Sequence, residues 1–212
     1  MPEPMPSPPV PSPSRRPPAA ASRATLVPWA RIAARRHGST PTLWLFTDSR
    51  RLPDPRPAAL RLPPRMAGIV FRHDDHPDRA AIGRDLARIC RVRHLALVVA
   101  GDVRLAVRLG AGVHLRGGRW PGPLRRRRGV ITSSAHSRPD ILRAERNGAV
   151  LAFLSPVFST RSHPGDPTLG AVRWTAVARA APIAVGALGG ISGRTVRRLP
   201  RCRIVGAIDS LA

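Results

Sequence analysis

Residues 95–115 read LALVVAGDVRLAVRLGAGVHL, and this stretch predicts the fold class. The run Leu95–Ala100 is short, continuous and apolar, which is typical of a strand buried on both faces of a parallel sheet. Residues Asp102–Leu109 have helical spacing and end at Gly110, a residue type that often closes helices. A second apolar run, Gly112–Leu115, completes a strand–helix–strand unit. The stretch therefore indicates an α/β protein with parallel strands.

The same alternation continues along the chain from about Thr42. Short runs rich in Val, Ile, Leu and Ala occur at Leu43–Phe46, Ala67–Phe71, Leu95–Ala100, Gly112–Leu115, Val130–Thr132, Ala149–Leu154, Ile183–Ala187 and Ile204–Ile208. Helical patterns occur at Asp78–Arg91, Asp102–Leu109, Pro139–Asn147, Ala171–Ala180 and Ser192–Leu199. Eight strands alternating with helices predict a (β/α)8 TIM barrel. The barrel would be a trimmed one, because about 170 residues is short for this fold.

The first 40 residues differ in composition from the rest. Ten of the 25 prolines lie in residues 1–28, mixed with Ser, Ala and Arg and without apolar periodicity. Such a stretch favours extended, solvated conformations. We therefore expect residues 1–40 to be a disordered Pro/Ser/Arg-rich tail and residues 41–212 to be the barrel. One short helix at Pro28–Arg36 would cover the gap that remains because no helix follows the eighth strand.

Length and composition exclude several classes of function. The 212 residues contain no apolar stretch long enough to span a membrane. The two cysteines make a reducing cytoplasm the expected location. The net charge of +24 comes from 36 basic residues that are all arginine. Because Lys, Gln and Tyr are absent while Ala, Gly and Pro abound, coding bias explains this charge better than selection for a polyanion, and we expect no nucleic-acid partner.

Polar residues and glycines follow the predicted strands, at the end of the barrel where such proteins carry their active sites. The pair Gly189-Gly190 and the pair Gly206-Ala207 offer small residues where a backbone can approach an anion closely. The motifs at the strand ends, in chain order, are Thr47-Asp48, Arg72, Gly112-Val113-His114, Ser134-Ala135-His136, Pro156-Val157-Phe158-Ser159-Thr160 and Gly189-Gly190-Ile191.

These six motifs in this order resemble the thiamine phosphate synthase/TenI superfamily, and the resemblance covers residues 42–211. It implies a barrel that binds a thiazole phosphate and joins it to hydroxymethylpyrimidine diphosphate, with release of pyrophosphate. The implied partners are these small molecules, and a homo-oligomer is expected because the family is often oligomeric.

The resemblance also implies roles for individual residues. The thiazole phosphate would be held by the backbone at Gly189, Gly190, Ala207 and Ile208. The diphosphate would face Arg72, Ser134 and Thr160, and the pyrimidine would face His114. Related thiazole tautomerases move a proton with the histidine that aligns with His136, and the two active-site lysines of the family align with Asp74 and His163.

The sequence departs from the family pattern at the magnesium ligands. The family uses an Asp in an Asn-Asp pair after strand three, where this chain has Ala100-Gly101 with Asp102 one place later. A second Asp follows the strand-four histidine, and Arg119 stands in its place. An arginine cannot supply the carboxylate oxygen that Mg²⁺ needs. Mg²⁺ is the cofactor that the resemblance implies, but we assign no metal ligands.

Several interpretations follow from this departure. Arg119, Arg116 or the run Arg125–Arg128 would neutralise the diphosphate in place of a metal. Alternatively, the chain works as a thiazole tautomerase through His136, or it has lost catalysis. An arginine-rich barrel that binds polyanions without catalysis is the interpretation from another class.

Overall fold

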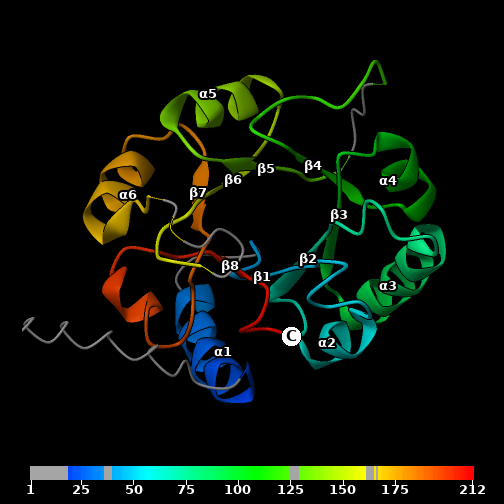
Figure 1. The fold of residues 1–212 in the computed structure, drawn as a ribbon, viewed down its shortest axis with the longest axis horizontal. Helices are drawn as coiled ribbons and strands as arrows, with labels where there is room; N and C mark the ends of the chain where they lie inside the picture. The colour runs from blue at the N-terminus through cyan, green and yellow to red at the C-terminus, as the bar shows by residue number, and fades with distance from the viewer. Residues whose placement is uncertain (1–18, 36–39, 125–128, 161–164, 166) are drawn as a thin grey trace, which may run out of the picture.

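The computed structural model describes residues 19–35, 40–124, 129–160, 165 and 167–212. Within them, eight parallel strands close into a barrel in chain order (Figure 1). The strands are β1 Leu43–Phe46, β2 Ala67–Phe71, β3 Ala96–Ala100, β4 Gly112–Leu115, β5 Ile131–Ala135, β6 Leu151–Leu154, β7 Ala184–Ala187 and β8 Val205–Ala207. The predicted barrel is confirmed, and every predicted run overlaps one strand. The largest difference is at β5, which continues through two serines that the apolar pattern did not include.

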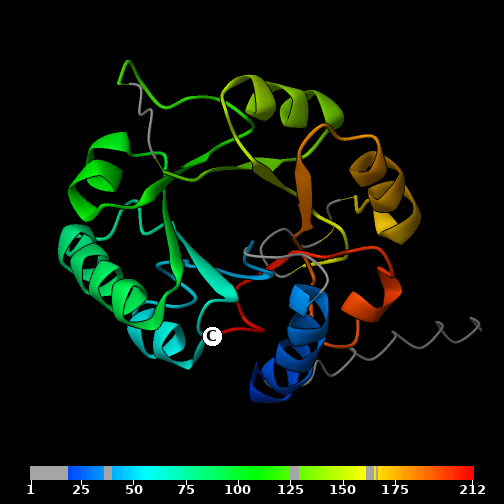
Figure 2. The ribbon, with the colours of Figure 1, turned by 180° about the vertical axis from the view of Figure 1, so that it is seen from behind.

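Helices form an outer ring around the barrel (Figures 1 and 2). They are α1 Ala19–Arg35, α2 Arg56–Arg61, α3 Arg79–Arg93, α4 Val103–Leu109, α5 Arg138–Arg146, α6 Gly170–Arg179 and the short 3-10 helix η1 Val196–Arg198. The sequence analysis did not predict α2, which has only six residues and starts directly after Pro55. The helix predicted at Ser192–Leu199 is confined to η1.

Helix α1 corrects the prediction that residues 1–40 are a disordered tail. Leu26 and Ala30 lie one turn apart and are fully buried against the barrel, which outweighs the helix-breaking tendency of Pro28. Arg23 Nη1 donates to the carbonyl of Ala212 at 3.0 Å. The helix therefore lies beside the end of β8, between η1 and α2 (Figures 1 and 2), where it closes the outer ring. The rest of the predicted tail, 1–18 and 36–39, lies outside the described residues.

Large aromatic side chains fill the interior of the barrel opposite glycines. Phe46 of β1 and Phe153 of β6 meet edge to face, with ring centroids 4.8 Å apart. A Cβ atom on Gly206 would lie 2.6 Å from the Phe46 ring, and one on Gly186 would lie 2.8 Å from Phe153. Because the interior is packed in this way, it forms a solid floor beneath the carboxyl ends of the strands.

A cavity of about 540 Å³ lies at the other end of the barrel, beside the amino ends of β7 and β8. Trp29 of α1 and Trp174 of α6 contribute to its lining. It occupies the space that the short η1 leaves uncovered between these two helices. In the described part of the chain, no helix is long and apolar enough to cross a membrane.

Candidate active site

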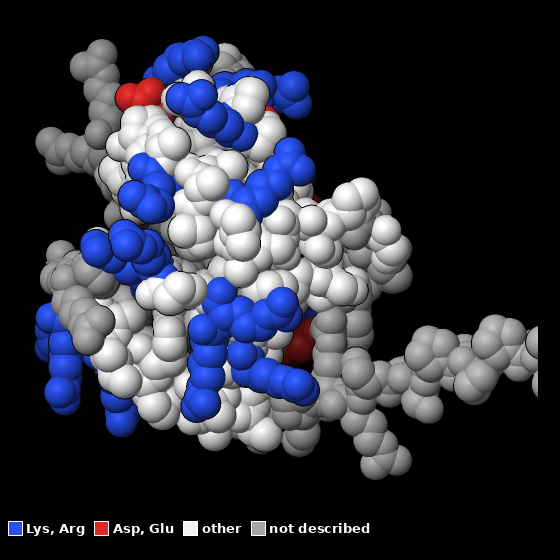
Figure 3. Space-filling model, turned by 90° about the vertical axis from the view of Figure 1, so that its left-hand side faces the viewer, with Lys and Arg blue, Asp and Glu red and all other residues white. Residues whose placement is uncertain are grey.

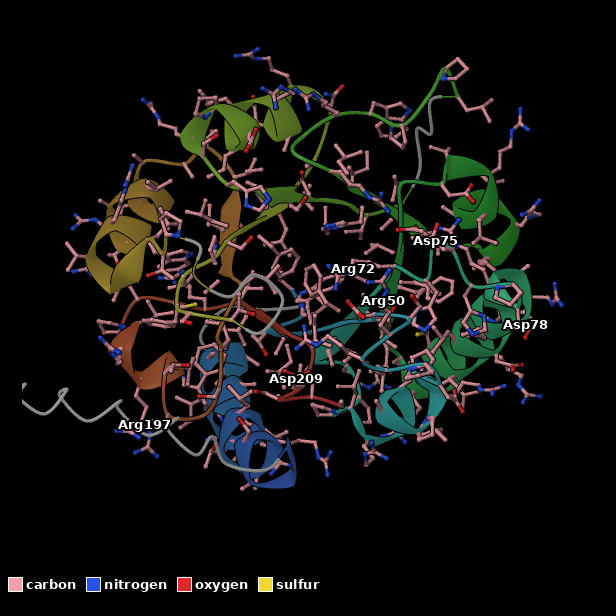
Figure 4. The ribbon with its side chains drawn as sticks, viewed as in Figure 1. Arg50, Arg72, Asp75, Asp78, Arg197 and Asp209 are labelled. Atoms are coloured by element: carbon pink, nitrogen blue, oxygen red, sulfur yellow. The ribbon has the colours of Figure 1, made fainter. Side chains whose placement is uncertain are left out.

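Arg72 directly follows β2 and lies near the middle of the ring of strands (Figure 4). Its Nε donates to the carbonyl of Thr47 at 2.9 Å, and its guanidinium lies 5.4 Å from the centre of the Phe46 ring. Burial lowers the pKa of Arg72, while Asp48 and Asp74 act in the opposite direction. The guanidinium stays charged at neutral pH, so a fixed cation stands above the aromatic floor.

His73 is a supporting residue that the sequence analysis did not assign. It is completely buried, and its Nε2 lies 3.1 Å from the carbonyls of both Leu52 and Pro53. Carbonyls only accept, so Nε2 carries the proton and Nδ1 accepts from the Thr47 hydroxyl, 3.0 Å away. This histidine fixes the loop after β1, and with it the backbone that orients Arg72.

His114 lies in β4 and forms part of the floor. Only 2% of it is exposed, its Nδ1 is 2.8 Å from Thr132 Oγ1, and its ring meets Phe46 edge to face at 5.6 Å. Burial lowers the pKa of His114 to about 3, with further contributions from the charges of Arg72 and Arg116. The ring is therefore neutral at physiological pH.

The turn after β4 is closed by a bond from the Arg119 amide to the carbonyl of Arg116, at 3.0 Å. The Gly117 amide donates to Ser134 Oγ at 3.2 Å, and the Gly118 amide donates to Ser133 Oγ at 3.0 Å. Ser134 thus holds the turn, a role the sequence did not indicate. The side chains of Arg116 and Arg119 are both exposed, and the guanidinium of Arg116 pairs with Asp74.

His136 follows β5 and is exposed to solvent. Its Nδ1 donates to the carbonyl of Ser155 at 3.0 Å, and its backbone amide donates to Asp140 Oδ2 at 3.0 Å. Because a carbonyl only accepts, the neutral ring carries its proton on Nδ1, and Nε2 has no hydrogen-bond partner among the described residues. This arrangement suits a general base.

Asp140 is the residue that anchors the backbone of His136. Burial raises the pKa of Asp140. Hydrogen bonds from the His136 amide, Arg143 and Ser137 lower this pKa by more, so the net shift is downward. The carboxylate is therefore ionised at neutral pH and holds the start of α5 against the loop after β5.

The Gly189-Gly190 loop needs glycine at both positions. Both residues have positive φ, 91° and 64°, and a Cβ on Gly190 would lie 2.5 Å from the carbonyl oxygen of Ser159. The Gly190 carbonyl accepts from Thr195 Oγ1 at 2.9 Å. Among the described residues, the amides of Gly189 and Gly190 have no hydrogen-bond acceptor. Two free amides side by side can bind an anion.

The remaining residues of the predicted site lie at the ends of β8 and of the loop after β6, or outside the described residues. Ala207 ends β8, opposite Leu45 of β1, and Ile208 follows it. Thr160 is half-buried at the end of the loop after β6. His163 and the run 125–128 lie outside the described residues. An ion pair between Arg51 and Asp209 joins the loop after β1 to the loop after β8. The sequence did not indicate this contact.

Two carboxylates beside the candidate site, Asp74 and Asp102, are already bound to protein donors. Asp102 Oδ1 accepts from the Leu105 amide at 2.8 Å and Oδ2 pairs with Arg79 at 3.0 Å. Asp74 Oδ1 pairs with Arg79 at 3.2 Å, and Oδ2 pairs with Arg116. In the part of the chain that the structure describes, no group of three acidic, His or Cys residues could hold a metal. These residues do not fit Mg²⁺.

The fold and these strand-end residues define a (β/α)8 barrel with a candidate site for small anionic molecules. The family model described as thiamine monophosphate synthase matches residues 56–208, and the chain belongs to this family.

Relatives agree with this assignment. The chain is 31% identical over 156 residues to the thiamine biosynthesis bifunctional protein ThiED of Geobacter sulfurreducens, covering 71% of this chain and 32% of the relative. It is 30% identical over 146 residues to the thiamine-phosphate synthase of Roseiflexus castenholzii, covering 65% of this chain and 64% of the relative. The chain thus spans less than two thirds of the length of these relatives.

Solved structures show the same fold. The thiamine phosphate pyrophosphorylase of Pyrococcus furiosus matches with a TM-score of 0.65 at 23% identity, covering 80% of this chain and 90% of that chain. The pyrophosphorylase of Bacteroides thetaiotaomicron matches with a TM-score of 0.54 at 17% identity, covering 81% and 84%.

Proposed function

We propose that this chain acts in thiamine biosynthesis as a transferase that joins a thiazole phosphate to hydroxymethylpyrimidine diphosphate. The observation that carries the proposal is a pair of anion-binding features at one end of the barrel. The cations Arg72 and Arg116 belong to the loops after β2 and β4, and the free amides of Gly189 and Gly190 belong to the loop after β7. Two phosphorylated substrates need two such features.

The proposed reaction needs little covalent chemistry from the protein. The bond between the pyrimidine methylene carbon and the diphosphate oxygen breaks, and its electron pair leaves with pyrophosphate. The lone pair of the thiazole nitrogen then forms a bond to the methylene carbon, and the positive charge ends on the thiazolium ring. The chain would hold both molecules in line and stabilise the departing charge with Arg72.

A thiazole tautomerase is the second candidate, and the state of His136 favours it. The bond from Nδ1 to the Ser155 carbonyl leaves Nε2 free to take a proton from a substrate carbon or nitrogen. This activity would need the Gly189-Gly190 amides but no diphosphate site.

Incubation of the full chain with both substrates separates these activities. We expect thiamine phosphate and pyrophosphate to appear in equal amounts, measured by chromatography and by phosphate release. The assay is run with excess EDTA and, separately, with Mg²⁺. Isomerisation of the thiazole phosphate without coupling in either condition would favour the tautomerase, and no reaction at all would contradict both activities.

Substitution of Gly190 tests the thiazole phosphate site. Gly190→Ala adds a Cβ atom against the Ser159 carbonyl and disturbs the free amides. We expect thiazole phosphate to raise the melting temperature of the native chain and to have little effect on this variant. Gly122→Ala is a matched control, because Gly122 has φ 76° and nothing within 4 Å of its Cβ position. Equal stabilisation of both variants would contradict the assignment.

Two wider expectations belong to the same proposal. The cytoplasmic location fits the free, buried thiols of Cys90 and Cys202. Burial raises the pKa of each thiol to about 12, which keeps it unreactive. The formation of a homo-oligomer stays a prediction.

A further inference from the structure

Four charged side chains form a continuous chain of ion pairs beside the candidate site. Arg79 Nη1 pairs with Asp102 at 3.0 Å and Arg79 Nη2 pairs with Asp74 at 3.2 Å. The second carboxylate oxygen of Asp74 pairs with Arg116. Arg79 also donates to the Ala100 carbonyl at 3.1 Å, so the network is tied to the end of β3.

Exposure of the side chains rises from Arg79 through Asp74 to Arg116. The side chain of Arg79 is 18% exposed, that of Asp74 is 35% exposed, and that of Arg116 is 58% exposed. Arg79 is therefore the least exposed member of the network and Arg116 the most exposed. The contacts described for the Arg116 guanidinium use one of its nitrogens, Nη2. Its other N–H groups make no hydrogen bond within the described part of the chain, and an arginine offers five donors in a planar fork that matches phosphate oxygens.

The backbone around Arg116 is held firmly. Gly117 donates to Ser134 and accepts from Arg143 Nη1 at 2.5 Å, and Gly118 accepts from Asn147 Nδ2 at 2.9 Å. A Cβ on Gly118 would lie 2.6 Å from the backbone of α5. The turn is thus packed on α5, and Arg116 starts from a fixed point. Such positioning reduces the entropy that is lost when the side chain binds a ligand.

Arg116 shares its surroundings with Arg72. Burial is the main cause of the lowered pKa of His114, but the charges of Arg72 and Arg116 both contribute to it. The charge of Arg116 also lowers the pKa of Arg72. Their positions are also linked by hydrogen bonds, because Arg116 pairs with Asp74 and the Asp74 amide donates to the carbonyl of Arg72 at 2.8 Å.

The network has the same net charge as a magnesium ion bound by two carboxylates. Mg²⁺ with two carboxylates carries no net charge, and neither do Arg79 and Arg116 with Asp74 and Asp102. Here the two positive charges belong to the polypeptide and are present before a ligand arrives. Bidentate hydrogen bonds from an arginine to a phosphate place a positive charge against the phosphate oxygens, as a bound metal ion would.

We propose that Arg116, positioned by Asp74 and Arg79, binds the diphosphate of the substrate together with Arg72, so that this chain binds diphosphate without a divalent cation. The inference rests on the proposed function for the identity of the substrate, but its anion site can be tested alone. Asp74 and Arg79 are positioning residues in this scheme, and Arg116 is the residue that contacts the ligand.

Calorimetric titration of the full chain with inorganic pyrophosphate is the direct test. It is done at physiological ionic strength with excess EDTA, and repeated with Mg²⁺. We expect binding in EDTA that Mg²⁺ does not tighten. Arg116→Gln should weaken it about tenfold or more, because a charge-assisted bond is lost. Arg116→Lys should recover part of the loss, since it keeps the charge but not the fork.

Two further variants separate this site from general attraction by a basic protein. Arg108→Gln removes an exposed arginine from the last turn of α4 and should change the affinity less than twofold. Asp74→Asn keeps Arg116 but releases it, so we expect a severalfold rise in KM for the diphosphate substrate with a smaller change in kcat. Equal effects of Arg116→Gln and Arg108→Gln would overturn the proposal.

The outcomes also distinguish this inference from the proposed function. Product formation that requires Mg²⁺ would overturn the inference and leave the function standing. Arg116-dependent binding of pyrophosphate in EDTA, with no product from the two substrates, would support the anion site and contradict the function. Pyrophosphate binding that appears only with Mg²⁺ would overturn the inference as well.

Discussion

At the scale of single residues, three histidines near the candidate site have different roles because their surroundings differ. His73 is buried and tied to backbone carbonyls, so it supports a loop. His114 is buried beside aromatic rings and two arginines, so it stays neutral. His136 is exposed and has a free Nε2. All three residues are histidines, so the surroundings of each ring decide its chemistry.

His114 makes stability depend on pH in a defined direction. The ring titrates near 6.5 when unfolded, and burial lowers its folded pKa to about 3. Between these values the unfolded chain binds a proton that the folded chain does not. The free energy of unfolding therefore falls as the pH falls below 6.5, by about 1.4 kcal/mol for each pH unit. Urea unfolding at pH 7 and at pH 5 measures this loss.

The variant His114→Gln isolates this contribution, because glutamine has no such titration. We expect the native chain to lose about 2 kcal/mol more than the variant between pH 7 and pH 5. Burial also lowers the pKa of His73, so both chains keep the same remaining pH dependence of stability from this residue. Identical pH dependence of the two chains would contradict the assignment to His114.

At the scale of elements, α1 is part of the barrel although it precedes the first strand. Its Ser22 side chain accepts from the Gly193 amide at 3.4 Å, and a Cβ on Gly193 would lie 1.5 Å from Thr25. The helix therefore lies directly against the loop that leads from Gly190 to η1. We infer that it also supports the loop of the predicted phosphate site.

Leu26→Ala tests the contribution of α1 to stability. Leu26 is fully buried, so the substitution should lower the free energy of unfolding by about 2–5 kcal/mol. Ile32→Ala changes a side chain that is 59% exposed on the same helix and should cost only about 0.5 kcal/mol. Both values come from urea unfolding curves. Equal, small effects would show that α1 is not needed for the folded barrel.

At the scale of the whole molecule, the excess of arginine is the dominant electrostatic feature. Figure 3 shows arginines at several places on the face that carries α6 and η1, separated by uncharged surface. On this face the arginines therefore do not form a single polyanion-binding patch. A net charge of +24 on 212 residues also implies self-repulsion in the folded state.

Added salt should therefore stabilise the chain. Sodium chloride screens the repulsion among the arginines, and the ion pairs that it weakens are exposed or half-buried and contribute little each. We expect the melting temperature to rise by several degrees between low and physiological ionic strength. Scanning calorimetry measures the shift. A fall in melting temperature would show that the ion pairs outweigh the repulsion.

Much of the candidate site could be predicted because barrel topology carries strand-end motifs to one place. Arg72, His136 and Gly189-Gly190 needed only their position after apolar runs and the order of the motifs. Arg116 was one of the arginines that the sequence offered, but its contact with Asp74 was not predictable, because it joins residues 42 positions apart. The family pattern placed Arg119 at the second magnesium ligand, whereas the ion pair with Asp74 is made by Arg116.

The sequence by itself determined the eight-stranded barrel, since short apolar runs separated by helical patterns are a local property of the chain. Only the tertiary structure decided that α1 is ordered, because its helix gains stability by burying Leu26 and Ala30 against a surface made by distant residues. The tertiary structure likewise decided which arginine joins Asp74 and which nitrogen of His136 is free. These outcomes depend on contacts between different strand ends, and such contacts exist only after the barrel closes.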